Sequence, residues 1–189
     1  MGLLADWQIA ELAEQGMITP FVDHQVREGN ISYGLSSYGY DIRVDNTFRI
    51  MLPEAVDEYG LPAIIDPKNF DVTLMVVNRG NFCFIKPNSY VLAQSVETFD
   101  MPENVTGVCV GKSTYVRSGI HILMSPLEAK WKGVLTLEIA NLTPYPAKIY
   151  AGEGIAQILF FRGEEKCSTS YADRNGKYQN QTGIVLPKV

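Results

Sequence analysis

The stretch GVLTLEIANL, residues 133–142, alternates as a β-strand does when one of its faces is buried. Because successive side chains point to opposite faces, one face is predicted to hold Leu135, Leu137 and Ile139, and the other Val134, Thr136, Glu138 and Ala140. Glutamates are common on solvated sheet faces. The other residues on this face are small or apolar, however, which favours a functional carboxylate at Glu138 that works as a general acid or base.

Segments of the same kind recur after about residue 40, rich in β-branched and aromatic residues and bounded by Pro, Gly and Asn. They are DIRVDNTFRI, VTLMVVNRG, FCFIKP, YVLAQSVETF, TGVCV, GVLTLEIANL and IAQILFF. Many short strands with such turns predict an all-β sandwich, barrel or jelly roll. The only long helix is expected in residues 3–18, where Leu4, Ile9, Leu12 and Ala13 have helical spacing and Gly16 is a stop.

Length and composition limit the class of protein. The 189 residues contain no repeat or long polar linker, so we expect a single domain over residues 1–189. A net charge of −5 disfavours a nucleic-acid partner. The sequence shows neither a long apolar run nor a signal pattern, and its three dispersed cysteines indicate reduced thiols. We therefore expect a cytoplasmic protein without membrane contact.

The segment GKST, residues 111–114, resembles the end of a phosphate-binding P-loop. The full motif requires a glycine at position 106, which is Thr106 here, and the nearest glycine is Gly107. The intervening residues Val108, Cys109 and Val110 are typical of a strand. The strict P-loop interpretation therefore fails.

A different anion site remains open at STYVR, residues 113–117. If this segment forms one helical turn, Ser113 and Arg117 project from the same side. Free backbone N–H groups, the hydroxyls of Ser113 and Thr114, and the Lys112 ammonium would then lie together. The alternative is a surface turn with a solvated lysine and arginine, and the spacing alone does not separate the two.

A catalytic or structural zinc site can be tested against the sequence by exclusion. Zinc nucleobase deaminases require His-x-Glu and Pro-Cys-x-x-Cys. The two histidines, His24 and His121, are followed by other residues, and Cys83, Cys109 and Cys167 are widely spaced. We therefore expect no zinc, and we expect the cysteines to be small buried hydrophobic residues.

The C-terminal stretch SYADRNGKYQNQTGIVLPKV, residues 170–189, is polar and aromatic with little periodicity. It could fray in solution, or fold over a ligand or a neighbouring subunit. Its aromatic, cationic and amide side chains suit a nucleotide. Composition alone favours a solvated tail.

Several motifs together resemble the dCTP deaminases, which are relatives of the trimeric dUTPases. They occur in the family's order and cover most of the chain: SSYGYDIRV, IIDPKNFD, GKSTYVRSGI, TLEIAN, PAKIYAGEGIAQILFF and SYADRNGKYQNQTGI. The resemblance implies a distorted β-barrel or jelly roll of the dUTPase-like β-clip type, assembled as a homotrimer with active sites between subunits. It also implies hydrolytic deamination of dCTP to dUTP and ammonia for dUMP synthesis, without zinc, with Mg²⁺ carried by the triphosphate. Feedback inhibition by dTTP is familiar in this family.

The resemblance assigns roles to residues by motif. Glu138, Arg117 and Ser113 are the implied catalytic residues. The implied substrate-binding residues are Lys112, Ser113, Thr114, Tyr115, Val116, Arg117, Thr136, Leu137, Glu138, Gln157, Tyr171, Lys177 and Gln181. None of them is an implied metal ligand. Residues 165–189 are expected to close over the ligand.

Two alternatives stay open. In related dUTPases a hairpin aspartate activates water for attack on the α-phosphate, but the matching stretch HILMSPLEAKWKG has Ser125 and Pro126, with Glu128 as the nearby carboxylate. Glu128 therefore keeps open a bifunctional deaminase/dUTPase that releases dUMP and diphosphate. The second alternative, from a different class, is a non-catalytic trimeric nucleotide-binding module.

Overall fold

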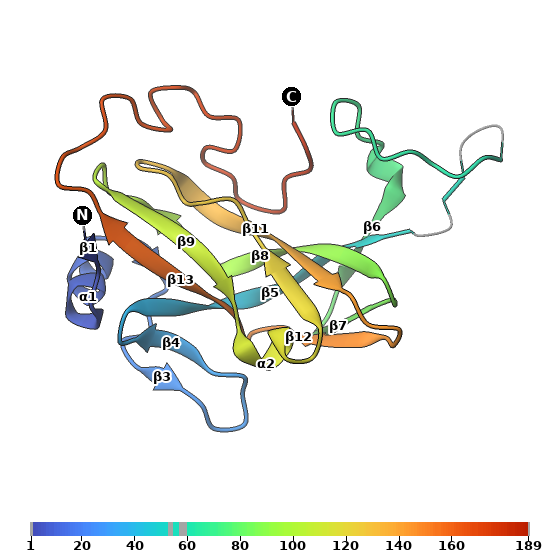
Figure 1. Cartoon of the computed structure of the whole chain (residues 1–189), viewed down its shortest axis with the longest axis horizontal. Coiled ribbons are helices and arrows are strands. Elements are labelled where there is room, and N and C mark those ends of the chain that lie inside the picture. The colour runs from blue at the N-terminus through green and yellow to red at the C-terminus, as the bar shows by residue number, and fades with distance from the viewer. Residues whose placement is uncertain (1, 53–54, 57–59, 189) are drawn as a thin grey trace.

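A computed structural model describes residues 2–52, 55–56 and 60–188. The chain forms a strongly curled antiparallel sheet with few helices (Figure 1). The helical elements are α1 (Asp6–Glu14), η1 (Val72–Leu74) and α2 (Ser113–Val116). The strands are β1 (Gly2–Leu3), β2 (Ile18–Thr19), β3 (Gln25–Val26), β4 (Tyr33–Ser36), β5 (Gly39–Met51), β6 (Met75–Arg79), β7 (Phe82–Ile85), β8 (Ser89–Asp100), β9 (Val105–Gly111), β10 (Ile120–Leu123), β11 (Lys132–Asn141), β12 (Ala147–Tyr150) and β13 (Gly154–Arg162).

The strands of the main sheet pair in the order β1-β13-β5-β8-β11-β10, and β9 pairs with the other edge of β13. β7 and β12 form a separate two-stranded ribbon. The mainly β prediction is confirmed, because every segment predicted as a strand contributes one. The prediction that residues 1–189 form a single domain stays a prediction.

The alternation in β11 produces the predicted two faces. Leu135, Leu137 and Ile139 are buried, and Leu137 and Ile139 have no exposed surface. They join the core cluster formed by β5, β8, β11 and β13, in which Phe48, Phe99 and Phe160 are also fully buried. Val134, Thr136, Glu138 and Ala140 on the other face are half-buried. The strand therefore fixes which side Glu138 faces.

Two local expectations are corrected. The segment VTLMVVNRG does not begin as a strand: Val72–Leu74 is a 3₁₀ turn, because the Asp71 carboxylate accepts a hydrogen bond from the Thr73 N–H (2.8 Å). Leu4 lies before α1 rather than within it, although it is buried, as Ile9 of the helix is. The predicted stop is confirmed, since Gly16 adopts a positive φ of 98° directly after the helix.

No helix in residues 2–52, 55–56 and 60–188 is long and apolar enough to cross a membrane.

The cysteine prediction holds for two of the three thiols. Cys83 is buried and Cys109 half-buried, and burial raises their pKa values to about 11 and about 12. Cys167 is exposed, so the prediction of a buried residue is wrong there, because the segment after β13 leaves the sheet.

This difference predicts the thiol reactivity. At pH 8 a disulfide reagent such as Ellman's should modify Cys167 rapidly, because only the thiolate reacts and the other two thiols are held protonated. All three should react after unfolding. Measuring thiols per chain against time, with Cys167→Ser as the control, checks this. Rapid modification of more than one thiol per chain in the native protein would contradict it.

Candidate active site

A pocket of about 720 Å³ lies between β11, the loop that follows β10, and the C-terminal segment (residues 165–188). Five of the predicted nucleotide-binding residues line it together: Thr136, Glu138, Tyr171, Lys177 and Gln181. The other lining residues are Leu92, Leu123, Met124, Ser125, Pro126, Leu127, Glu128, Trp131, Leu135, Tyr178, Val185 and Pro187. The pocket therefore combines apolar walls with a set of polar and charged groups, as sites that bind a heterocycle do.

Glu138 lies between two leucines. In the sheet it pairs with Leu123 of β10 on one side and with Leu92 of β8 on the other, and both line the same pocket. Its side chain is half-buried on the pocket face of β11. A carboxylate in this position is shielded on both sides but open toward the cavity, where it can exchange a proton with a bound molecule.

Thr136 connects β11 to the C-terminal segment. Its hydroxyl oxygen accepts hydrogen bonds from the Val185 N–H (3.3 Å) and from Gln181 Nε2 (3.4 Å). The register between β11 and β8 shifts just before Thr136, where the Leu135 N–H donates to Ser95 Oγ (2.8 Å). This irregularity changes the direction of β11 at the point where its residues begin to line the pocket.

The C-terminal segment is docked on its own chain. Its backbone runs beside residues 129–134: the Asn180 N–H donates to the Lys132 carbonyl (2.8 Å), and the Val134 N–H donates to the Gln181 carbonyl (3.0 Å). The Trp131 indole N–H donates to the Tyr178 carbonyl (3.0 Å). These contacts place Tyr171, Lys177 and Gln181 at the pocket.

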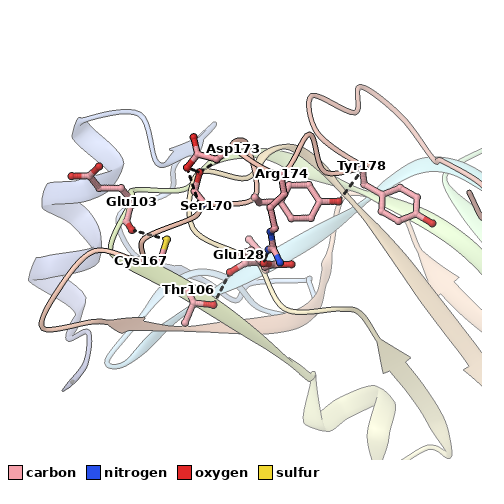
Figure 2. A network of polar contacts seen from close by, with 10 residues as sticks. Glu103, Thr106, Glu128, Cys167, Ser170, Asp173, Arg174 and Tyr178 are labelled. Carbon is pink, nitrogen blue, oxygen red and sulfur yellow. Dashed lines mark hydrogen bonds and ion pairs between the residues drawn. The ribbon is translucent and has the colours of Figure 1, made fainter. Parts of the chain in front are cut away.

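Figure 2 shows how the first half of this segment is fastened. Arg174 reaches down to form an ion pair with Glu128, and its guanidinium also lies 5.9 Å from the centre of the Tyr171 ring. The Tyr171 hydroxyl accepts from the Tyr178 N–H (3.0 Å). Asp173 accepts from Ser170 Oγ (2.7 Å), and this hydrogen bond lowers the pKa of Asp173. Glu128, the carboxylate of the hairpin, is thus paired with Arg174 of the C-terminal segment.

Gly133 allows the segment to approach this closely. It has a φ of 144°, and a Cβ built on it would lie 2.7 Å from the Gln181 carbonyl oxygen and 3.0 Å from its nitrogen. Gly133→Ala is expected to weaken docking by about 1–3 kcal/mol, the usual cost of such backbone strain, because either the backbone or the segment must move.

Limited proteolysis of residues 165–189 measures that change, and cleavage should be faster in Gly133→Ala. Gly152→Ala is the matched control, because Gly152 also has a positive φ (79°) but nothing lies within 4 Å of its Cβ position. Equal cleavage of the two variants would show that Gly133 does not hold the segment.

The remaining predicted residues lie elsewhere. α2 is a single helical turn, one of the two alternatives left open for STYVR, with the Arg117 N–H donating to the Ser113 carbonyl (2.9 Å). Ser113, Thr114, Val116 and Arg117 are exposed there. Figure 1 shows α2 at the end of β9 and β10 that points away from the C-terminal segment. No α2 residue lines the pocket.

Three more of the predicted nucleotide-binding residues, Lys112, Tyr115 and Gln157, are buried or half-buried in or beside the sheet. Gln157 on β13 is half-buried and pairs with Asp41 and Val110. The Lys112 ammonium forms an ion pair with Asp41 inside the sheet. Tyr115 is buried, and its hydroxyl accepts from the Tyr150 N–H (3.2 Å). The side chains of Tyr115 and of Leu137 belong to the core, so only their backbone groups are available to a ligand.

Sequence reasoning missed part of the pocket. Trp131 and Leu123 line it without having been predicted, and Tyr178 was covered only by the general expectation that the aromatic side chains of residues 170–189 suit a nucleotide. A signal existed for Trp131, which lies in the hairpin sequence HILMSPLEAKWKG beside Glu128. Leu123 and Tyr178 reach the pocket through pairing with distant segments, which the local pattern does not encode.

Among the residues that the structure describes, no group of three or more His, Cys, Asp or Glu side chains is arranged to hold a metal ion.

Comparison with known proteins identifies the family. A family profile described as dCTP deaminase-like matches residues 3–163. The dCTP deaminase of Acidobacterium capsulatum is 54% identical over the full length of both chains, and that of Nitratiruptor sp. is 51% identical, also over both full lengths. The solved 2'-deoxycytidine 5'-triphosphate deaminase of Agrobacterium tumefaciens shares the fold (TM-score 0.63, 15% identity); the match covers 86% of this chain and 48% of that one. The chain belongs to the dCTP deaminase-like family.

Proposed function

We propose that this protein deaminates dCTP to dUTP and ammonia. The observation that carries the proposal is Glu138, a carboxylate set between two leucines in an apolar pocket large enough for a pyrimidine nucleoside. Full-length relatives that are more than half identical and named dCTP deaminase support the choice of substrate. The pocket also contains Thr136, Tyr171, Lys177 and Gln181, the residues expected to bind the nucleotide.

In the proposed reaction, water adds to C4 of the cytosine ring. Glu138 takes a proton from the water as the C4–O bond forms and delivers it to N3; it then takes the proton of the new C4 hydroxyl and delivers it to the departing amine. The C4–N bond then breaks, ammonia leaves, and the C4 carbonyl of uracil remains. Arg117 and Ser113 are proposed to orient the water and stabilise the charge that develops. No metal-bound hydroxide is needed, because one carboxylate serves every proton transfer.

The site is proposed to form between the subunits of a homotrimer. Within one chain Glu138 faces a pocket that contains no α2 residue, and α2 lies toward the other end of β10. A neighbouring subunit can bring its α2, with Ser113, Thr114 and Arg117, to the pocket of the first, as cyclic assembly allows. The distorted barrel of the dUTPase-like type is proposed as the subunit fold of this trimer.

The triphosphate is proposed to bind as its Mg²⁺ complex, so that the metal arrives with the substrate. The exposed backbone and hydroxyls of α2 would contact the phosphates, together with Lys177 from the C-terminal segment. Zinc is proposed to be absent from the reaction. Inhibition by dTTP is proposed to occur in the same pocket, since dTTP is also a pyrimidine deoxynucleoside triphosphate.

One incubation tests the function. The purified protein is mixed with dCTP and Mg²⁺, with and without a zinc chelator, and the nucleotides are separated by chromatography. We expect dUTP and free ammonia in equal amounts, unaffected by the chelator. If dUMP and diphosphate appear instead, the enzyme is bifunctional. Bound dCTP without any product would indicate a binding module and overturn the proposal.

A further inference from the structure

The lysine of the GKST segment points into the sheet. Lys112 Nζ forms an ion pair with Asp41 Oδ2 of β5, and their side chains are only 13% and 5% exposed. Removing one partner of such a pair leaves an uncompensated buried charge, which is strongly unfavourable. The lysine ammonium is therefore held in place from inside the fold.

The backbone of Lys112 joins the sheet to α2. Its N–H donates to the Ile155 carbonyl on β13 (3.1 Å), and its own carbonyl accepts from the N–H groups of Tyr115 and Val116 (both 3.0 Å). The turn is also packed tightly, because a Cβ on Gly111 would lie 2.8 Å from Val116 Cγ2. A movement of Lys112 would therefore displace α2.

In a P-loop the lysine of this segment reaches toward phosphate. Here it could do so only by leaving Asp41, a residue that is 3% exposed and that would then be buried without its cation. Contact of Lys112 with the phosphate thus competes with the ion pair inside the sheet. The exposed groups that follow it, Ser113, Thr114 and Arg117, face no such competition.

We infer that Asp41 is a positioning residue, which pairs with Lys112 inside the sheet and so holds α2 in the orientation that the nucleotide site requires. The inference rests on the proposed function for the role of α2, but the anchoring itself does not. Lys112 then acts from beneath the turn. Asp41 lies 71 positions from Lys112 in the chain, and no local motif marks it.

Amide hydrogen exchange tests the anchoring without requiring activity. Asp41→Asn and Lys112→Met should each speed exchange in the peptide spanning residues 113–119 by about 10-fold or more, because the amides of Tyr115 and Val116 lose a fixed acceptor. Glu103→Gln is the matched control, since it removes an exposed ion pair with Lys130 (3.9 Å). Unchanged exchange in folded Asp41→Asn would overturn the inference, whatever reaction the wild-type protein performs.

Binding of dUTP and dUDP, measured by calorimetry, separates positioning from phosphate contact. We expect each single variant to lose affinity for both nucleotides by the same factor, about 10- to 100-fold, as misplaced binding groups do. The double variant Asp41→Asn/Lys112→Met should lose no more than the worse single variant, because it leaves no unpaired charge. If a single variant does not fold, hydrogen exchange in the double variant still shows whether the Asp41–Lys112 pair holds α2.

A loss of affinity that depends on the number of phosphates would contradict the anchoring role. A loss in Lys112→Met that is much larger for dUTP than for dUDP, with Asp41→Asn unaffected, would make Lys112 a phosphate ligand and overturn the inference. If instead the wild-type protein binds dUTP but forms no product from dCTP, the proposed function fails while the anchoring result stands.

Discussion

Replacing Glu138 by glutamine should lower kcat for dCTP by at least about 10³-fold, within the range expected for loss of a general acid and base. Glutamine keeps the shape of the side chain between Leu92 and Leu123 but can neither accept nor deliver the proton. Because the pocket and the C-terminal segment are unchanged, dCTP should bind with an affinity within a few-fold of the wild-type value.

Two measurements check this expectation: dUTP formation followed by chromatography, and dCTP binding followed by calorimetry. Glu14→Gln, which removes an exposed carboxylate on α1, is the control for the change in net charge and should turn over normally. A Glu138→Gln variant with near-normal turnover would require another proton carrier. Glu128 would then be the candidate, as the other carboxylate that lines the pocket.

The predicted and observed folds agree where the pattern is local and long. β5, β8, β11 and β13 each contain nine or more residues, and their alternation or apolar content is enough to identify them. The strands β1, β2 and β3 contain two residues each, so no periodicity can develop in them. They exist because longer neighbours offer free hydrogen-bonding edges, as β13 does for Gly2 and Leu3.

The ion pairs inside the sheet could not be predicted from the local pattern either, because they depend on pairing between strands that are distant in the sequence. Glu97 has a fully buried side chain that bonds Arg43 Nε (2.8 Å) and the Arg43 N–H (3.0 Å), although the two residues lie 54 positions apart. Burial raises the pKa of Glu97. In sequence each residue looks like an ordinary charge on a strand, and only the pairing of β5 with β8 brings them together.

The site was predicted in composition but not in arrangement. The motifs identified Glu138 and Thr136 on a strand and Tyr171, Lys177 and Gln181 in the C-terminal segment, and the structure brings these five to one pocket. The residues at α2 do not line this pocket in a single chain; the resemblance implies sites between subunits, and that arrangement stays a prediction. A sequence records which residues belong to a site, and it does not record which copy of the chain supplies each one.

The separation of α2 from the Glu138 pocket within one chain predicts that two inactive variants can complement each other. Arg117→Ala alone should be nearly inactive, because the arginine is proposed to stabilise charge at the reacting carbon, and loss of one such group costs about 10²–10³-fold. If α2 and the Glu138 pocket of one site come from different subunits, mixing inactive Arg117→Ala chains with inactive Glu138→Gln chains should restore activity. In randomly assembled trimers, about one quarter of the sites combine an intact α2 with an intact Glu138.

The two variants should be co-expressed with different tags, purified through both tags, and assayed for dUTP against each variant alone. Purification through both tags removes the homotrimers, and each mixed trimer keeps one intact site in three, so recovery to about one third of the wild-type rate is expected. Analytical ultracentrifugation checks that the mixed species is a trimer. Mixed trimers that remain inactive, while wild-type trimers treated in the same way are active, would place both groups of each site within one chain. The docked C-terminal segment would then have to move far enough to admit α2 of its own subunit, which the fixed pairing of β10 with β11 at Leu123 and Glu138 opposes.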